Sequence, residues 1–375
     1  MPTELLQLDR AHFLAHHWQR ESVLIPQALH GFTAPISADE LAGLAMEEAV
    51  ESRIIRESGD RWDIEHGPFS VADLQRPGRW SLLVQSVDHH WQSVAELRRL
   101  IDFLPQWRLD DIMISYSTDG ASVGPHWDNY DVFLLQASGA KQWRLGPSCD
   151  ETTALKEHPE LRLLDTFECR SQHRLLPGDV LYVPPGIAHW GIASGAGMTI
   201  SIGFRAPRVS DLVSRWTDAK LASIPSESFY SDPPLTSPIR AGEITAEALE
   251  QARAFALRAL QAPMDGQWFG ELVTERGTGA MDRAAIGAAR ERMERGPRSI
   301  VLAPEAGLAW HARAQDLLVF ANGGTLPVAL QWLPFVSDLC NGQSVNGEAL
   351  TAVTSDQEGV TLLGFLLDHG CIDVR

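Results

Sequence analysis

Cysteine is scarce in this sequence. Only 4 occur among 375 residues, at Cys149, Cys169, Cys340 and Cys371, and no two of them form a C-x-x-C pair. This excludes a disulfide framework and a zinc ribbon, and it is typical of a protein in a reducing cytosol. No uninterrupted apolar run reaches the roughly 18 residues of a membrane-spanning helix. The N-terminal stretch also lacks the basic and apolar regions of a signal peptide. We therefore expect a cytoplasmic protein without a membrane segment.

Basic residues are also few relative to acidic ones. There are 31 Lys and Arg against 49 Asp and Glu, which gives a formal net charge of -18. Both halves of the chain are acidic, so a general nucleic-acid-binding role is disfavoured, because affinity for phosphates needs clustered Lys and Arg. An acidic protein is better suited to a basic partner. The simpler alternative, in which the charge only provides solubility, stays open.

The pattern of apolar residues predicts an α+β protein of two or three domains. Residues 111–206 alternate short apolar runs with Gly and Pro turns, which favours antiparallel strands in a sandwich or barrel and disfavours a parallel Rossmann sheet. Before this region the spacing predicts helices near 39–51 and 89–104 and an extended stretch over 51–64. The expected strands have the sequences DIMISYS, YDVFLLQ, KQWRLG, DVLYVPP and MTISIGF.

After Pro207 the pattern becomes helical. Two amphipathic helices are expected, one around Leu212 to Trp216 and one over 245–260, with a Pro- and Ser-rich loop between them. This pair is too short to bury its apolar faces alone, so it must pack on the barrel or on a second copy of itself. Residues 266–375 form a third region with helices near 282–294, 326–340 and 359–369. Two strand candidates there are SIVLA and DLLVFA.

One group of residues in the central region suggests metal chemistry. His126 and Asp128 lie two positions apart, so on an extended strand both side chains point to the same face. His189, which follows a Pro-Pro-Gly turn, is the candidate for a third ligand from a neighbouring strand. Two histidines and one carboxylate on one face of a metal leave three coordination positions open, as in non-haem Fe(II) oxygenases. A closed structural zinc site has no such vacancy.

A basic side chain follows the first two ligands at a suggestive distance. Lys141 lies 15 residues after His126, beyond an expected turn at 138–140, and begins the next apolar run. A buried ammonium group needs a partner, and the distal carboxylate of a bound 2-oxo acid would supply one. Ser115 could add a hydroxyl hydrogen bond to that carboxylate, although a surface serine on a strand explains it equally well.

The specificity of these signals differs. An H-x-D pair alone is common by chance, and a single histidine after a turn is usually structural. The combination of H-x-D, a lysine one strand later and P-P-G-x-x-H in a β-rich region is much rarer. This combination predicts a metal-dependent oxygenase.

At these residues the sequence resembles the JmjC branch of the cupin-fold oxygenases. It resembles most closely the bacterial ribosomal oxygenases, which hydroxylate an arginine of large-subunit ribosomal protein L-sixteen. The resemblance covers the whole chain. It rests on GPHWDNYDVFLLQ with GAKQWRLG, PGDVLYVPPGIAHWG, SIGFRAP and the C-terminal phrases GGTLPVALQWLPFVSDLCNG and LLGFLLDHGCID.

The resemblance implies a double-stranded β-helix, the cupin/JmjC jelly-roll barrel, over 1–209. It also implies a helical dimerisation segment over 210–265 and a winged-helix-like domain over 266–375. It makes His126, Asp128 and His189 the Fe(II) ligands, with O2 and 2-oxoglutarate as co-substrates. Lys141 and Ser115 would contact the 2-oxoglutarate, although relatives hold Arg in place of Lys141.

The resemblance further implies substrate contacts at Asp119 and Ser210. The partner would be a basic ribosomal protein, and the enzyme a homodimer. Direct DNA binding is not expected, because the C-terminal region is acidic and PVALQWLPFVSDLC carries no Lys or Arg to place in a groove.

Three functions compete at this stage. The first is hydroxylation of a ribosomal protein. The second is demethylation of methylated Lys or Arg by a related JmjC enzyme, which would release formaldehyde. The third is a non-catalytic ribosome-associated scaffold, against which the complete ligand set argues.

Overall fold

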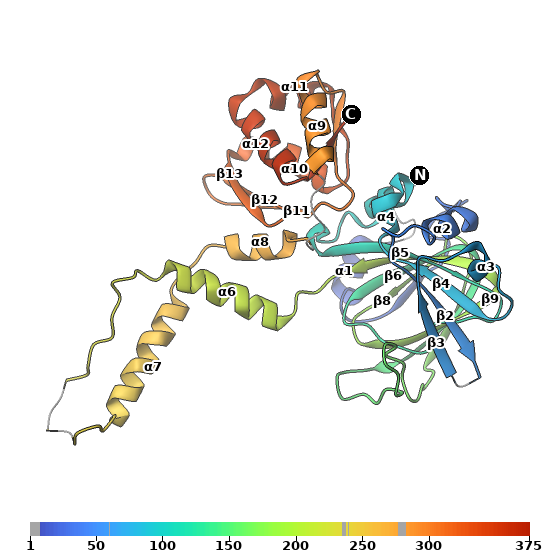
Figure 1. Ribbon diagram of the computed structural model, residues 1–375, viewed down its shortest axis with the longest axis horizontal. Coiled ribbons are helices and arrows are strands. Elements are labelled where there is room, and N and C mark those ends of the chain that lie inside the picture. The colour runs from blue at the N-terminus through green and yellow to red at the C-terminus, as the bar shows by residue number, and fades with distance from the viewer. Residues whose placement is uncertain (1–7, 60, 235–237, 239, 277–282) are drawn as a thin grey trace. The chain divides into compact units, whose positions relative to one another are not determined.

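The chain divides into two compact units. The computed structural model describes residues 8–375 apart from 60, 235–237, 239 and 277–282 (Figure 1). The first unit runs to Ala206 and includes 301–305 and 338–344, and the second contains 207–300, 306–337 and 345–375. None of the helices in these described ranges is long and apolar enough to cross a membrane.

A large antiparallel sheet forms the body of the first unit, confirming the α+β, jelly-roll prediction. In the described residues it has nine strands in the order β1-β8-β6-β9-β5-β4-β2-β3, with β7 paired to β6. The strands are β1 (Val23–Ile25), β2 (Ser52–Ser58), β3 (Arg61–His66), β4 (Trp80–Val84), β5 (Leu109–Ser117), β6 (Asp131–Ser148), β7 (Ser171–Leu175), β8 (Val180–Val183) and β9 (Ile187–Phe204).

Two 18-residue strands, β6 and β9, pair along their whole lengths and organise this sheet. The expected turn at 138–140 between two separate strands was wrong, because this segment forms an irregularity inside β6. Gly139 has a positive φ of 65° there, and a Cβ on it would lie 2.4 Å from the carbonyl oxygen of Ala196. A β-bulge bends a strand without reversing it. The two halves of β6 therefore pair with β8 and β7 in turn.

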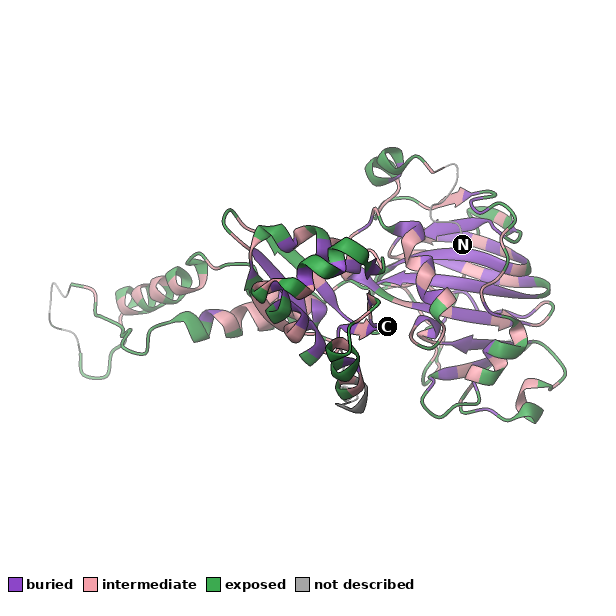
Figure 2. Ribbon diagram, turned by 90° about the horizontal axis from the view of Figure 1, so that it is seen from above, coloured by how far each residue is buried: buried purple, intermediate pink, exposed green. Residues whose placement is uncertain are grey.

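Alternation along the strands separates a core face from a cavity face. On β5, Ile112 and Ile114 are fully buried in the main apolar core, while Met113 and Ser115 line a cavity. The same period of two holds on β9, and it follows from strand geometry. The core face is completed by N-terminal helices such as α1 (Arg10–His16) and α2 (Ala38–Leu44), the latter with a Ser37–Glu40 capping box. Figure 2 shows how much of this sheet is buried.

The single helix expected over 89–104 was also wrong. The segment forms α4 (Val87–His90), α5 (Gln92–Ala95) and a 3-10 helix over Glu96–Ile101. Trp91 adopts extended dihedral angles (φ -135°, ψ 103°), which interrupt the helical path between α4 and α5. The expected extended stretch over 51–64 is confirmed as parts of the paired strands β2 and β3. A short helix, α3 (Val71–Leu74), lies between β3 and β4.

The second unit is mixed α and β. Its helices and strands are α6 (Val209–Ser223), α7 (Ala246–Gln261), α8 (Gln267–Thr274), α9 (Arg283–Glu294), β10 (Ser299–Leu302), β11 (Leu308–Ala312), β12 (Leu317–Ala321), β13 (Gly324–Val328), α10 (Leu333–Cys340), β14 (Val345–Asn346), α11 (Gly347–Ser355), α12 (Gln357–Asp368) and β15 (Ile372–Val374), of which β10 and α10 end in residues assigned to the first unit. In the described part of this unit the strands form two three-stranded sheets, β14-β10-β15 and β11-β12-β13.

The helix expected over 326–340 is shorter than predicted. Residues 324–328 form β13, and α10 begins only at Leu333. Two prolines explain the difference: Pro327 lies in a strand at the edge of its sheet, where its missing N–H is tolerated, and Pro334 fits the first turn of a helix. The strands predicted from SIVLA and DLLVFA correspond to β10 and β12.

Candidate metal centre and its cavity

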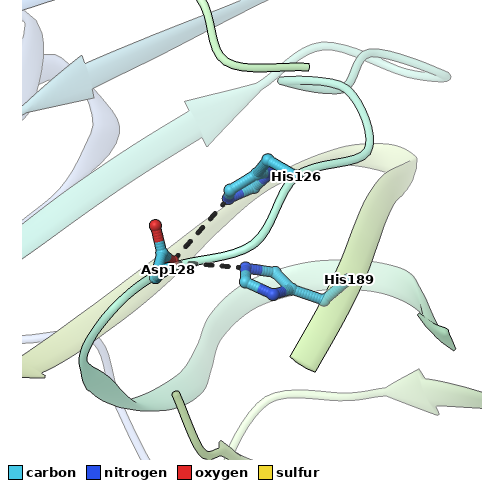
Figure 3. A group of neighbouring side chains, drawn as sticks. All are labelled: His126, Asp128 and His189. Atoms are coloured by element: carbon cyan, nitrogen blue, oxygen red, sulfur yellow. Dashed lines mark ion pairs between the residues drawn. The ribbon is translucent and has the colours of Figure 1, made fainter. Parts of the chain in front are cut away.

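Three side chains from two separate segments of the chain meet at one point. The imidazoles of His126 and His189 and the carboxylate of Asp128 each offer a ligand atom, and these atoms lie within 4.8 Å of one another. Asp128 Oδ2 is 3.9 Å from His126 Nε2 and 3.5 Å from His189 Nε2 (Figure 3). No other set of three His, Cys, Asp or Glu side chains converges in this way among the described residues.

The backbone that holds this cluster differs from the predicted strand. His126 and Asp128 lie in the connection between β5 and β6, outside any named strand. His126 nevertheless pairs with His189 on β9 through two backbone hydrogen bonds: His126 N–H donates to His189 O at 3.1 Å, and His189 N–H donates to His126 O at 2.8 Å. This isolated bridge fixes two of the three side chains directly opposite each other.

Hydrogen bonds also select which nitrogen of each histidine faces the centre. His126 Nδ1 lies 2.9 Å from the carbonyl oxygen of Gly124, and His189 Nδ1 lies 2.9 Å from that of Ile187. A carbonyl oxygen can only accept, so each Nδ1 carries the proton and each Nε2 presents a lone pair to the centre. This outer hydrogen bonding is the usual device that orients a metal-binding imidazole.

The charge state of His189 suits the same purpose. Its side chain is 2% exposed. Burial, followed by the neighbouring His126, lowers the pKa of His189 to about 4. The imidazole is therefore neutral near pH 7, which is the form that binds a metal ion.

The Pro-Pro-Gly turn anchors the third member of the cluster. Gly186 N–H donates to the carbonyl oxygen of Asp128 at 2.7 Å, so the turn before β9 ties the backbone of Asp128 to the strand that bears His189. Gly186 has a φ of +79°, which glycine adopts without strain.

Tyr130 is a neighbour that the sequence analysis did not single out. Partial burial raises the pKa of Tyr130, and the adjacent Asp128 carboxylate raises it further. The phenol of Tyr130 therefore stays protonated beside the carboxylate of Asp128 near pH 7.

The cluster opens on a cavity of about 580 Å³ inside the first unit. The walls come from β2 to β6, β9 and the connections that carry the cluster, and they combine apolar and charged side chains. The charged and histidine side chains that line the cavity are Arg53, His66, Asp110, Asp111, His126, Asp128, Lys141, Glu160, Arg162 and His189.

Lys141 lies in the wall of this cavity, on β6. Its side chain is 5% exposed, and burial lowers the pKa of Lys141 to about 8. No described carboxylate lies within ion-pair distance of its ammonium group, whose Nζ is 5.0 Å from the centre of the Trp143 ring. A buried cation without a protein partner is well placed to bind an anionic ligand.

Ser115 also lines the cavity. It lies on β5 opposite Thr199 of β9 and is buried, so the interpretation as a surface serine was wrong. Its hydroxyl is therefore placed among the groups that a molecule in the cavity can meet.

The two weaker candidates lie elsewhere. Asp119 is exposed, is not among the residues that line the cavity, and accepts a 2.6 Å hydrogen bond from Gly195 N–H through Oδ1. This contact holds the end of β5 to a turn within β9. Ser210 is an exposed residue in the first turn of α6, in the second unit.

The donor set fits a catalytic divalent metal. Two imidazole nitrogens and one carboxylate oxygen, with no fourth side chain converging in the described residues, match the facial arrangement used by non-haem Fe(II) oxygenases. The jelly-roll sheet and this open site together define the class of cupin-fold, metal-dependent oxygenases.

Comparison with known proteins places the chain more narrowly. A family model described as "JmjC domain" matches residues 96–212. The ribosomal protein uL16 3-hydroxylase of Escherichia coli is 40% identical over 274 residues, 72% of each chain. A probable ribosomal oxygenase of Haemophilus influenzae is 36% identical over 54% of this chain and 50% of its own length.

Solved structures agree with this placement. The X-ray structure of E. coli ycfD superposes with a TM-score of 0.83 at 33% identity, covering 99% of this chain and 100% of that one. A structure of the same ribosomal oxygenase in complex with cobalt and 2-oxoglutarate gives 0.79 at 32% identity, with 99% of each chain covered. The chain belongs to the JmjC family of ribosomal oxygenases, and it is a metal- and 2-oxoglutarate-dependent oxygenase.

Proposed function

We propose that this enzyme hydroxylates an arginine side chain of large-subunit ribosomal protein uL16. His126, Asp128 and His189 hold Fe(II), and Lys141 with Ser115 binds the distal carboxylate of 2-oxoglutarate. The observation that carries the proposal is the open cluster of two histidines and one carboxylate on a cavity that also contains a buried, unpaired lysine. The 40% identity to a uL16 3-hydroxylase supports the choice of substrate.

The protein residues supply binding, orientation and exclusion of water. When bound, Fe(II) with 2-oxoglutarate and O2 supplies the oxidising power, and the co-substrate leaves as succinate and carbon dioxide. The Nδ1 hydrogen bonds keep both imidazoles in the orientation a metal requires. The Lys141 ammonium group orients the co-substrate through its distal carboxylate. The apolar walls of the cavity limit access of water to the reacting atoms.

Carboxylates support a cationic substrate. Asp110, Asp111 and Glu160 line the same cavity, and the chain carries a net charge of -18. Opposite charges steer a basic ribosomal protein toward an acidic enzyme. The sequence resemblance adds Asp119 and Ser210 as candidate contacts of the arginine guanidinium group.

The direct test is incubation of the enzyme with Fe(II), 2-oxoglutarate and purified uL16, followed by peptide mass spectrometry. We expect a gain of one oxygen atom on one arginine, dependent on 2-oxoglutarate. Release of formaldehyde from a methylated peptide without oxygen gain would identify a demethylase instead. Unchanged uL16, with the same result for intact large subunits, would contradict the assigned substrate.

Asp111→Asn is expected to weaken use of the cationic substrate. Asp111 Oδ2 accepts hydrogen bonds from Gln85 Nε2 and Ser86 N–H, both at 2.8 Å, and from Ser86 Oγ at 3.3 Å, while Oδ1 accepts none from the described residues. Loss of the charge should lower kcat/KM for a uL16 peptide roughly 10- to 100-fold, the usual range for a hydrogen bond to a charged group. The affinity for 2-oxoglutarate should not change. Glu48→Gln, at an exposed surface position, is the control. Equal activity of both variants would remove Asp111 from substrate recognition.

Binding of 2-oxoglutarate should weaken at alkaline pH. Burial lowers the pKa of Lys141 to about 8, so its ammonium form is complete below this pH and is lost as the pH rises through it. The dissociation constant should be flat near pH 7 and rise by up to about tenfold per pH unit above 8. Calorimetric titration of the cobalt-loaded protein measures this. In Lys141→Arg the slope should disappear because Arg stays protonated. If the pH dependence of the dissociation constant persisted in this variant, it would arise from a group other than Lys141.

The helices α6 and α7 support a homodimer. Val209, Val213 and Leu221 on α6 and Leu249 and Leu257 on α7 are exposed apolar side chains. Helices with uncovered apolar positions gain stability by packing on another surface. We propose that residues 210–265 pair with a second copy of the chain. The acidic C-terminal region, a winged-helix-like domain, contacts protein and not DNA. The enzyme acts on ribosomal protein in the cytoplasm. Light scattering after gel filtration would measure the mass of the assembly.

A further inference from the structure

Trp143 presents a buried donor that no protein group satisfies. Its side chain is 4% exposed, and its indole Nε1 has no hydrogen-bond partner in the part of the chain that the structure describes. Buried N–H groups are nearly always hydrogen bonded, because one without a partner loses its bonds to water. Among the described residues, Trp143 is the only cavity-lining side chain with a buried, unpartnered nitrogen or oxygen.

The Trp143 side chain lies between an apolar cluster and the cavity. On the protein side Trp143 packs in an apolar cluster whose other members, including Val132, Leu134, Leu145 and Leu175, carry no side-chain acceptor. On the other side it lines the cavity that contains the metal-binding cluster. An acceptor that enters this cavity is therefore able to complete the hydrogen bonding of the indole.

The strand register places Trp143 between the lysine and the metal centre. On β6, Lys141, Trp143 and Leu145 alternate on one face, and they lie opposite Ala193, Gly191 and His189 of β9. Lys141 Nζ is 5.0 Å from the centre of the Trp143 ring, and the His189 ring is 5.9 Å from it. The Trp143 ring therefore lies near both ends of a ligand that extends from the metal centre to Lys141.

Gly191 is the residue that allows this arrangement. A Cβ at position 191 would lie 2.8 Å from Lys141 Cε and 2.8 Å from Trp143 Cη2. The backbone of Gly191 does not have the positive φ that requires glycine. The missing side chain of Gly191 therefore leaves room on β9 for the Lys141 and Trp143 side chains of the neighbouring strand β6.

We propose that the Trp143 indole N–H donates a hydrogen bond to the distal carboxylate of 2-oxoglutarate, beside the Lys141 ammonium group. The inference rests on the co-substrate pocket of the proposed function. It adds a neutral donor of fixed direction, the indole N–H, to the charge of the flexible Lys141 side chain. Trp143 is a positioning residue: a planar donor fixes where the carboxylate lies, which a freely rotating ammonium group alone does not.

The test compares two ligands that differ in the distal carboxylate. Wild-type protein and Trp143→Phe, both loaded with Co(II), are titrated by calorimetry with 2-oxoglutarate and with 2-oxobutyrate, which lacks that carboxylate. We expect the variant to bind 2-oxoglutarate about tenfold more weakly, the scale of one hydrogen bond to a charged group. Its affinity for 2-oxobutyrate should be unchanged. Equal losses for both ligands would mean that Trp143 only shapes the cavity and would overturn the inference.

A second measurement does not depend on the stability of the variant. The sequence has 12 tryptophans, each with one indole N–H resonance. In zinc-loaded, nitrogen-labelled protein, the Trp143 resonance, assigned through Trp143→Phe or by selective labelling, should shift downfield with 2-oxoglutarate and stay in place with 2-oxobutyrate. A resonance that 2-oxoglutarate leaves unmoved would also overturn the inference. If wild-type protein bound no 2-oxoglutarate at all, the proposed function itself would be wrong. If it bound 2-oxoglutarate without any effect at Trp143, only the inference about Trp143 would be wrong.

Discussion

Replacing Asp128 with Ala is expected to abolish hydroxylation. Asp128 is the only carboxylate in the described cluster, and Oδ2 lies within 4 Å of both histidine Nε2 atoms. Two imidazoles alone provide neither the negative charge nor the third ligand that fixes Fe(II) in a facial site. Turnover of uL16 should fall to background at any 2-oxoglutarate concentration. Metal binding, measured by equilibrium dialysis, should weaken strongly.

The matched control is Asp165→Ala, which removes an exposed carboxylate outside the cavity lining. It should retain wild-type activity and metal content. Circular dichroism and thermal unfolding of both variants show whether the sheet remains folded. Retained activity in Asp128→Ala with bound metal would contradict the assignment of this cluster as the catalytic centre.

Replacing Lys141 with Met should produce the second largest effect, confined to the co-substrate. Met keeps the length and the apolar packing but removes the charge, so a bound distal carboxylate would be buried without a cation. Removal of one partner of a buried ion pair costs about 3 to 5 kcal/mol. This corresponds to a rise of roughly 100- to 5000-fold in the dissociation constant for 2-oxoglutarate. Metal binding should be nearly unchanged.

Two further variants make this result specific. Lys141→Arg should keep most of the affinity, because the resemblance indicates that relatives use Arg here and a guanidinium group binds a carboxylate. Lys156→Met, which removes a lysine outside the cavity lining, should behave as wild type. If Lys141→Met bound 2-oxoglutarate as tightly as wild type, the distal carboxylate would have to lie elsewhere in the cavity.

The Trp143 donor and the Lys141 charge are separable in these experiments. Loss of the lysine removes a long-range attraction and the pH dependence of binding. Loss of the indole N–H removes a directional bond and leaves that pH dependence in place. Both residues lie on one face of β6 and share the space left by Gly191. A substitution at either position should therefore be checked for displacement of the other.

Local sequence determined the chemistry of the centre. A facial Fe(II) site needs two imidazoles and one carboxylate. The combination of His126, Asp128 and His189 with a lysine and a Pro-Pro-Gly turn is rare enough in sequence to indicate such a site. Alternation of apolar and polar residues indicated the antiparallel strands, because a strand with one buried face repeats every second residue. The capping box at Ser37 is likewise a short-range signal.

The predictions from sequence were wrong where contacts with distant segments determine the local conformation. The segment at 138–140 has the composition of a turn, yet the carbonyl oxygen of Ala196 and the neighbouring β9 strand hold it as a bulge in one long strand. His126 lies outside any named strand, but its backbone pairs with His189, 63 residues later. No window of sequence contains both partners of such contacts.

What the sequence by itself determined was therefore the set of ligands, the lysine and the strand-rich character of the domain. Only the tertiary structure decided that Ser115 is buried, that Tyr130 lies beside Asp128, and that no group among the described residues accepts the Trp143 N–H near Lys141. The physical reason is that residue type and spacing are local properties. Burial and hydrogen-bond satisfaction depend on which distant strands pack against a residue.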